Sequence, residues 1–217
     1  MSKSITHRRL ATRDTPELYP TKAWGTWGLL EHVSFDGTIH EPACGDGRIS
    51  RVLEQSGYEV ESSDLYAQGY GIPYIDFLSG TSSMENIVTN PPYKLADQFT
   101  RVALQRATKK VALLFQLRGL EGQKKYKNIY SVNKPNLVLI FSERLTFWKK
   151  EPGNIFRTDG TAAHMWLIWD KENPDEHGID WIAPGCQERY EKETGREGNM
   201  GYKPVSFSPI KRYRKLV

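Results

Sequence analysis

The stretch Val88-Thr89-Asn90-Pro91-Pro92-Tyr93 decides the fold of this chain. A short apolar run ends here in a polar residue, two prolines and an aromatic ring. Proline cannot donate to a β-ladder or continue a helix, so we predict that a strand stops at this point. Asn90 and Tyr93 then lie on a stiff turn at the carboxyl end of a strand, where ligands bind in open α/β sheets. The alternative is a Pro-Pro loop with an asparagine cap and no function.

A glycine turn precedes this stretch. Residues 38–50 are predicted to form a strand that runs into a turn and then into a helix over Ile49–Gln55. Gly45 and Gly47 allow positive φ and a close approach of the backbone to a ligand. The spacing of Glu41 to these two glycines differs from the Gly-x-Gly-x-x-Gly fingerprint of dinucleotide-binding proteins. The spacing therefore does not favour a dinucleotide-binding protein.

An acidic residue ends the next predicted strand, Tyr58–Ser63. Asp64 follows Gly47 by seventeen residues. Doubly wound nucleotide-binding folds place an acidic side chain there to accept from ribose hydroxyls. Aspartate is also a common turn residue, so this interpretation depends on the glycine turn before it.

Taken together, these motifs resemble the class I S-adenosylmethionine-dependent methyltransferases that methylate exocyclic amines. Their catalytic motif is Asn, Asp or Ser followed by Pro-Pro and Tyr or Phe, here Asn90-Pro91-Pro92-Tyr93. The resemblance covers most of residues 19–170. It implies an α/β fold, a Rossmann-like seven-stranded methyltransferase sheet with helices on both faces. Leu137–Phe141 and Met165–Trp169 would form its terminal antiparallel hairpin.

The resemblance also implies S-adenosylmethionine as the cofactor. Glu41 would neutralise the methionine ammonium, and Asp64 would bind the ribose. Asp76 would accept from the adenine amine, with Phe77 beside the ring. Thr21 is predicted both as the N-cap of a first helix, Lys22–Val33, and as a contact to the methionine end. The expected cofactor-binding residues are Tyr19, Thr21, Glu41, Ala43, Gly45, Gly47, Asp64, Leu65, Asp76, Phe77 and Asn90.

The catalytic residues implied by the resemblance are Asn90, Pro91, Pro92 and Tyr93. The Asn90 side-chain carbonyl and the Pro91 backbone carbonyl would accept the two hydrogens of adenine N6, so that the nitrogen lone pair points at the methyl group. Tyr93 would stack on the target base after it leaves the duplex. Positioning supplies much of the rate in such a transfer, so no metal ligand is expected.

Basic segments suggest a nucleic-acid partner. Residues 118–134 carry five Lys or Arg against one acid, and residues 147–157 interleave aromatics with bases. Such mixtures suit phosphate contacts and base stacking, although a solvated helix face and an ordinary hairpin connection are the alternatives. The expected nucleic-acid contacts are Arg118, Lys124, Lys125, Lys127, Lys149, Arg157, Lys211 and Arg212.

The order of the motifs resembles that of phage and prophage DNA adenine-N6 methyltransferases. DNA is the expected partner, with short or relaxed sequence specificity, since no separate recognition domain follows. Three alternatives stay open: an RNA adenine methyltransferase, a protein-glutamine methyltransferase, and a silent nucleic-acid-binding module.

Composition bounds the remaining expectations. The 217 residues carry a net charge of +4, and the two cysteines give no zinc spacing or disulfide framework. We expect a flexible basic arm over 1–18, a catalytic domain over 19–171, and an extension over 172–217 with one short helix near Gln187–Thr194 and a basic tail. Without a long apolar segment, the chain is expected to be cytoplasmic, in a bacterial or phage-infected cell, and a monomer or weak dimer.

Overall fold

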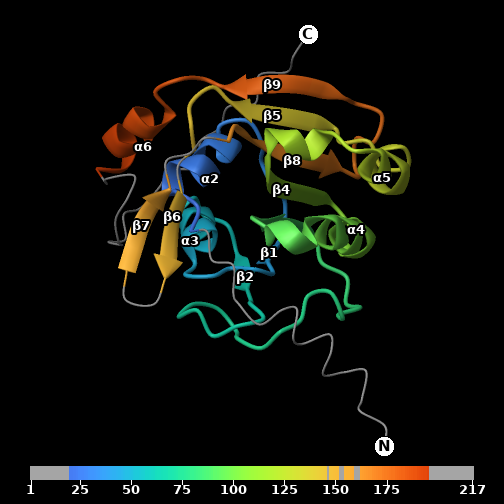
Figure 1. Cartoon of the computed structure of the whole chain (residues 1–217), viewed down its shortest axis with the longest axis horizontal. Coiled ribbons are helices and arrows are strands. Elements are labelled where there is room, and N and C mark those ends of the chain that lie inside the picture. The colour runs from blue at the N-terminus through green and yellow to red at the C-terminus, as the bar shows by residue number, and fades with distance from the viewer. Residues whose placement is uncertain (1–19, 146, 152–153, 159–161, 196–217) are drawn as a thin grey trace, which may run out of the picture.

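A seven-stranded mixed sheet forms the centre of the protein (Figure 1). The computed structural model describes residues 20–145, 147–151, 154–158 and 162–195. The strand order is β2-β1-β3-β4-β8-β5-β9. The strands are β1 Ile39–Glu41, β2 Val60–Ser62, β3 Asn86–Thr89, β4 Lys110–Gln116, β5 Leu137–Phe141, β8 His164–Asp170 and β9 Gly178–Ile182. Only β8 is antiparallel to its neighbours, so the other six strands end at one common edge.

Between β5 and β8 the chain forms a separate two-stranded ribbon. β6, Phe147–Glu151, pairs antiparallel with β7, Asn154–Thr158. In Figure 1 this ribbon projects from the same side of the molecule as α6.

Helices cover both faces of the sheet, as the sequence predicted. The helices are α2 Ala23–Leu30, α3 Arg48–Gln55, α4 Ala96–Arg106, α5 Gln123–Lys125 and α6 Cys186–Thr194. Two 3₁₀ turns, η1 Tyr93–Leu95 and η2 Leu117–Leu120, and one π-helical turn, η3 Tyr126–Tyr130, complete the described elements.

The alternation along β4 divides the apolar residues into two cores. Ala112 and Leu114 belong to a core shared with α2, α3 and α6, while Val111 and Leu113 belong to a core shared with α4 and η3. A strand buried on both faces reads as a continuous apolar run, which is why this strand was predictable. The indole nitrogen of Trp166 donates to the carbonyl of Gly25 across 2.9 Å and attaches α2 to the sheet.

The end of the sheet differs from the sequence expectation. The pair β5 and β8 forms the predicted antiparallel hairpin, and α6 is the short helix expected near Gln187–Thr194. However, residues 178–182, for which no strand was predicted, form β9 parallel to β5. This strand and α6 both lie after residue 171, and α6 packs into the core with α2. The three segments expected along the chain stay predictions, and residues 1–18 lie outside the described part of the chain.

The first helix also begins differently from the prediction. Lys22, not Thr21, is the N-cap of α2, and no side chain caps that end. The Thr21 hydroxyl instead contacts the predicted catalytic turn. No described helix is both long and apolar enough to cross a membrane.

Candidate active site

The predicted catalytic turn lies at the carboxyl end of β3. All four residues of β3 are buried, and the strand stops directly before Asn90. The two prolines are followed by η1, in which the Leu95 N–H donates to the Pro92 carbonyl across 2.9 Å. α4 begins immediately afterwards, so the turn is fixed between a buried strand and a helix. Asn90 and Tyr93 are each partly exposed, as a site that receives a ligand requires.

A residue just before α2 holds the Asn90 side chain. Its Nδ2 donates to Thr21 Oγ1 across 3.2 Å, and the two residues are 69 positions apart in the sequence. Thr21 is only 3% exposed, which fixes its hydroxyl in place. An amide has its donors on nitrogen and its acceptor on oxygen, so this bond also sets the direction of the Asn90 carbonyl.

The glycine turn has the conformation that the sequence predicted. Gly45 and Gly47 have φ of 56° and 80°, a region that side-chain-bearing residues rarely adopt. Gly47 is the N-cap of α3. A Cβ at Gly47 would lie 2.3 Å from the ring of Tyr70, so this glycine is required even before any ligand binds.

Asp64 joins the end of β2 to this turn. Its Oδ2 accepts from the Gly45 N–H and its Oδ1 from the Tyr66 N–H, both across 2.9 Å. Burial raises the pKa of Asp64, although these backbone hydrogen bonds oppose the shift. The Leu65 N–H is a third backbone partner, and a carboxylate with about four acceptor sites can still accept from a ribose hydroxyl.

Glu41 is the most deeply buried of the predicted site residues, at 1% exposure. Its Oε2 accepts from the Ser50 N–H across 2.7 Å and from the Ser50 hydroxyl. The same hydroxyl lies 2.6 Å from that of Ser62, which links β1, α3 and β2. Burial raises the pKa of Glu41 well above its ordinary value. Ser50 had no signal in the sequence beyond its place in the helix after the glycine turn.

The remaining predicted cofactor residues vary in their exposure. Ala43 and Leu65 are partly exposed, and Asp76 accepts from the Leu78 N–H across 3.0 Å. Phe77 is 3% exposed, because its ring packs against Phe99 at a centroid distance of 5.1 Å. It therefore offers no free face to adenine in this structure, and its role as a cofactor contact stays a prediction. Tyr19 lies outside the described residues.

The predicted nucleic-acid contacts separate into two kinds. Arg118, Lys124 and Lys127 are exposed and form no ion pair within the described ranges. Lys125 instead lies 3.6 Å from Asp97 Oδ1 and above the ring of Phe115. The side chains of Lys149 and Arg157, and the whole of Lys211 and Arg212, lie outside the described part.

A buried histidine near this edge was not predicted. His164 begins β8 and pairs with Gln116 at the carboxyl end of β4. It lies two residues before Trp166, and so on the same face of the sheet as α2. Burial lowers the pKa of His164 to about 4, so its ring is neutral at physiological pH. Only its place at the start of an apolar strand could have indicated it.

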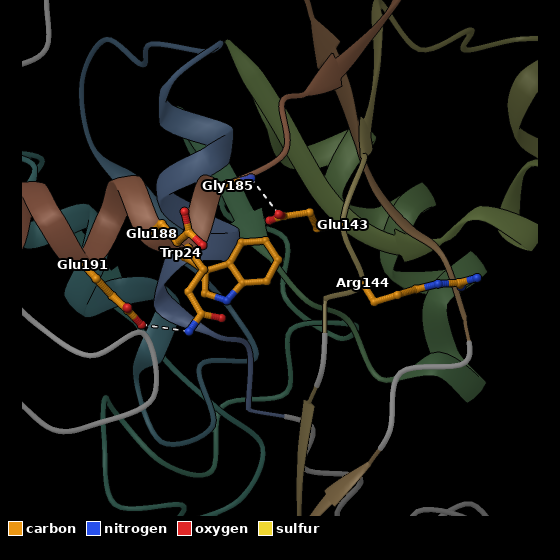
Figure 2. Close-up of a pocket in the computed structure, with 7 residues that line it drawn as sticks. Trp24, Glu143, Arg144, Gly185, Glu188 and Glu191 are labelled. Carbon is orange, nitrogen blue, oxygen red and sulfur yellow. Dashed lines mark hydrogen bonds between the residues drawn. The ribbon is translucent and has the colours of Figure 1, made fainter.

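A hollow of about 570 Å³ opens further along the same edge (Figure 2). Figure 2 shows the Trp24 indole between Glu188 and Glu191 of α6 and, on the other side, Glu143 after β5. The Glu143 carboxylate accepts from the Gly185 N–H across 2.6 Å. The hollow is lined by Trp24, Glu143, Arg144, Gly185, Gln187, Glu188 and Glu191. Its residues come from three separate segments, so no local motif could predict it.

Comparison with known proteins gives a match in structure only. No protein-family model matches the chain, and no curated protein matches its sequence. A protein of Listeria monocytogenes, described as a class I S-adenosylmethionine-dependent methyltransferase, is 14% identical with a TM-score of 0.51. The match covers 78% of this chain and 67% of that one. The chain has the Rossmann-like methyltransferase fold.

A second methyltransferase-fold match is a protein of Vibrio vulnificus, described as the modification subunit of a type I restriction enzyme. It is 12% identical with a TM-score of 0.52, and the match covers 78% of this chain and 48% of that one. The chain thus spans about half the length of the Vibrio protein. These structural matches establish the methyltransferase fold. Because the identities are this low, the reaction has to be argued from the site.

Proposed function

We propose that this protein transfers a methyl group from S-adenosylmethionine to the N6 amine of adenine in DNA. One observation carries the proposal: Asn90-Pro91-Pro92-Tyr93 lies at the carboxyl end of β3, and the Asn90 amide is held there by Thr21 across 3.2 Å. This bond fixes which end of the Asn90 amide donates. The proposal assigns the other end, the carbonyl oxygen, to the target amine.

The neighbouring strand ends fit the cofactor. Gly45 and Gly47 have the positive φ that lets a backbone approach a ligand, and Asp64 keeps lone pairs for a ribose diol. Glu41 supplies a buried carboxyl group behind the same turn. When bound, S-adenosylmethionine supplies an electrophilic methyl group. These residues would hold it at the ends of β1 and β2, beside the catalytic turn on β3.

The chain's own part in the reaction is orientation. Asn90 and the carbonyl of Pro91 accept the two hydrogens of the target amine and so direct its lone pair. Tyr93, on the 3₁₀ turn that follows, lies where a ring can stack on an extruded base.

The exposed cations support nucleic acid as the substrate. Arg118, Lys124 and Lys127 form no ion pair in the described structure, and the segment they belong to follows the carboxyl end of β4, next to β3. Unpaired cations beside a site attract phosphates. A protein-glutamine substrate gives no reason for this charge.

One assay tests the proposal. Tritiated S-adenosylmethionine is offered with duplex DNA, single-stranded DNA and RNA, and the labelled nucleosides are identified after digestion. We expect labelled N6-methyl-2′-deoxyadenosine, and transfer about 10²–10³ slower with the Asn90→Ala protein. Label found in RNA, or in glutamine of an added protein, would replace the DNA assignment with one of the two alternative substrates. Cofactor binding without any transfer would favour the silent module.

A further inference from the structure

The segment after η2 contains an unusual helical turn. α5 continues directly into η3, where the Ser131 N–H donates to the Tyr126 carbonyl across 2.8 Å, a bond that spans five residues. Such π-type turns are rare, and they occur frequently at functional sites. The turn widens the helix at the position of Tyr126.

The inner side of this segment is fixed to the core. Ile129 is 3% exposed, and the Tyr130 hydroxyl donates to the Gly119 carbonyl across 2.7 Å. Lys125 reaches Asp97 at 3.6 Å, and Asp97 lies in the first turn of α4, just after the catalytic turn. The segment is therefore held next to the candidate active site, and its outer side chains are presented by a fixed backbone.

The outer side combines one aromatic ring with cations. Tyr126 is 66% exposed, while Ile129, one turn further along the same segment, is 3% exposed. Lys124 and Lys127 flank it in the sequence, and both side chains are exposed and form no ion pair in the described part of the chain. Glu121 is the only acid between residues 118 and 134. Like charges this close repel one another, so the arrangement is better suited to an anionic partner than to the free protein.

We propose that Tyr126 stacks on an unpaired nucleobase while Lys124 and Lys127 hold the adjacent phosphates. An aromatic ring on a basic surface binds single strands in this way, because every base has a face on which to stack. A regular duplex hides those faces, so this surface selects single-stranded or locally opened nucleic acid. The inference rests on the proposed function and deepens it by naming the strand state of the substrate.

Binding of a short labelled single-stranded DNA oligonucleotide to the full chain tests this, with its duplex and an RNA of the same sequence as further arms. Tyr126→Ala should weaken single-strand binding about 5- to 100-fold, the range measured for losing one stacking ring. Tyr126→Phe should bind like the wild type. Trp181→Ala is the matched control, because Trp181 is also exposed, at 55%, but lies on the edge strand β9. It should leave binding unchanged. If RNA binds more tightly than DNA and Tyr126→Ala weakens that binding, the stacking site stands and its preferred ligand is RNA.

Wild-type affinity in Tyr126→Ala would overturn the inference. So would an equal loss in Tyr126→Phe, because the hydroxyl and not the ring would then be the contact. Calorimetry with S-adenosylmethionine separates this from the proposed function. Cofactor binding without oligonucleotide binding would remove only the inference, and oligonucleotide binding through Tyr126 without cofactor binding would remove only the methyltransferase proposal.

Discussion

The amide nitrogen of Asn90 lies 3.2 Å from the hydroxyl of Thr21 and donates to it. This bond joins the turn after β3 to the segment that enters α2. Its consequence is directional, because an amide that donates through its nitrogen has the direction of its carbonyl oxygen fixed at the same time. We propose that Thr21 positions Asn90. The sequence predicted Thr21 as an N-cap, a place that Lys22 takes, and as a cofactor contact, which stays a prediction.

Thr21→Val, which keeps the shape and removes the hydroxyl, tests this role. We expect the single-turnover rate of methyl transfer to fall about 2- to 10-fold, the range of one neutral hydrogen bond. Thr21→Ser should restore the rate. Cofactor affinity, measured by calorimetry, should change little. A large loss of cofactor affinity with an unchanged rate would instead support the direct cofactor contact.

Asn90→Ala and Asp64→Ala should have opposite effects. Asn90→Ala removes the oriented acceptor, and loss of one such group typically costs about 10²–10³ in rate. It should leave cofactor affinity nearly unchanged. Asp64→Ala removes the group expected to bind the ribose, so it should weaken cofactor binding more than Asn90→Ala does. The measurements are single-turnover transfer and calorimetry. Near-wild-type turnover in Asn90→Ala would end the assignment of this turn as the catalytic centre.

Glu41 should make the protein less stable as pH rises. Burial raises its pKa well above the ordinary value of 4.5, so the native state holds the proton more tightly than the unfolded state. This contribution is fully present below pH 4.5 and is lost as pH rises towards the native pKa. Glu41→Gln keeps an acceptor for Ser50 without a charge, so it should remove this part of the pH dependence. Urea unfolding at several pH values gives the free energy of unfolding of both proteins. If this free energy changes with pH equally in the wild type and in Glu41→Gln, the prediction is wrong.

Lys124 and Lys125 are neighbours with different expected roles. Lys124→Ala should lower the salt dependence of single-strand binding by about 0.7 in logarithmic slope, the value for one lost phosphate contact on a single strand. Lys125 is 26% exposed and reaches Asp97 and the Phe115 ring. Lys125→Ala should therefore lower the melting temperature slightly and leave the slope unchanged. Salt titrations of binding and thermal unfolding of both variants measure these effects. If both variants lower the logarithmic salt slope equally, the two lysines do not differ in role.

The same pair shows what the sequence could and could not predict. Some features depend only on residues that are close in the sequence. The buried strand β4, the glycine turn at Gly45 and the proline turn after Asn90 are of this kind, so their positions could be predicted. Lys125 depends on Asp97 and Phe115, which only the fold brings together. β9 was missed because it is an edge strand, with Ile179 and Trp181 exposed at 60% and 55%, and lacks a continuous apolar run.

Gly47 should be required for two separable reasons. A Cβ there would lie 2.3 Å from the Tyr70 ring, and φ is +80°, which costs a residue other than glycine about 1–2 kcal/mol. Gly47→Ala should therefore lower the free energy of unfolding, and Gly47→Ala combined with Tyr70→Ala should recover only the part due to the ring. If S-adenosylmethionine passes close to the backbone at Gly47, neither Gly47→Ala nor the double variant will bind it. Tyr70→Ala alone will bind it. Urea unfolding and calorimetry on the three variants measure both effects. Wild-type cofactor affinity in the double variant would show that Gly47 serves the packing of Tyr70 and not the approach of a ligand.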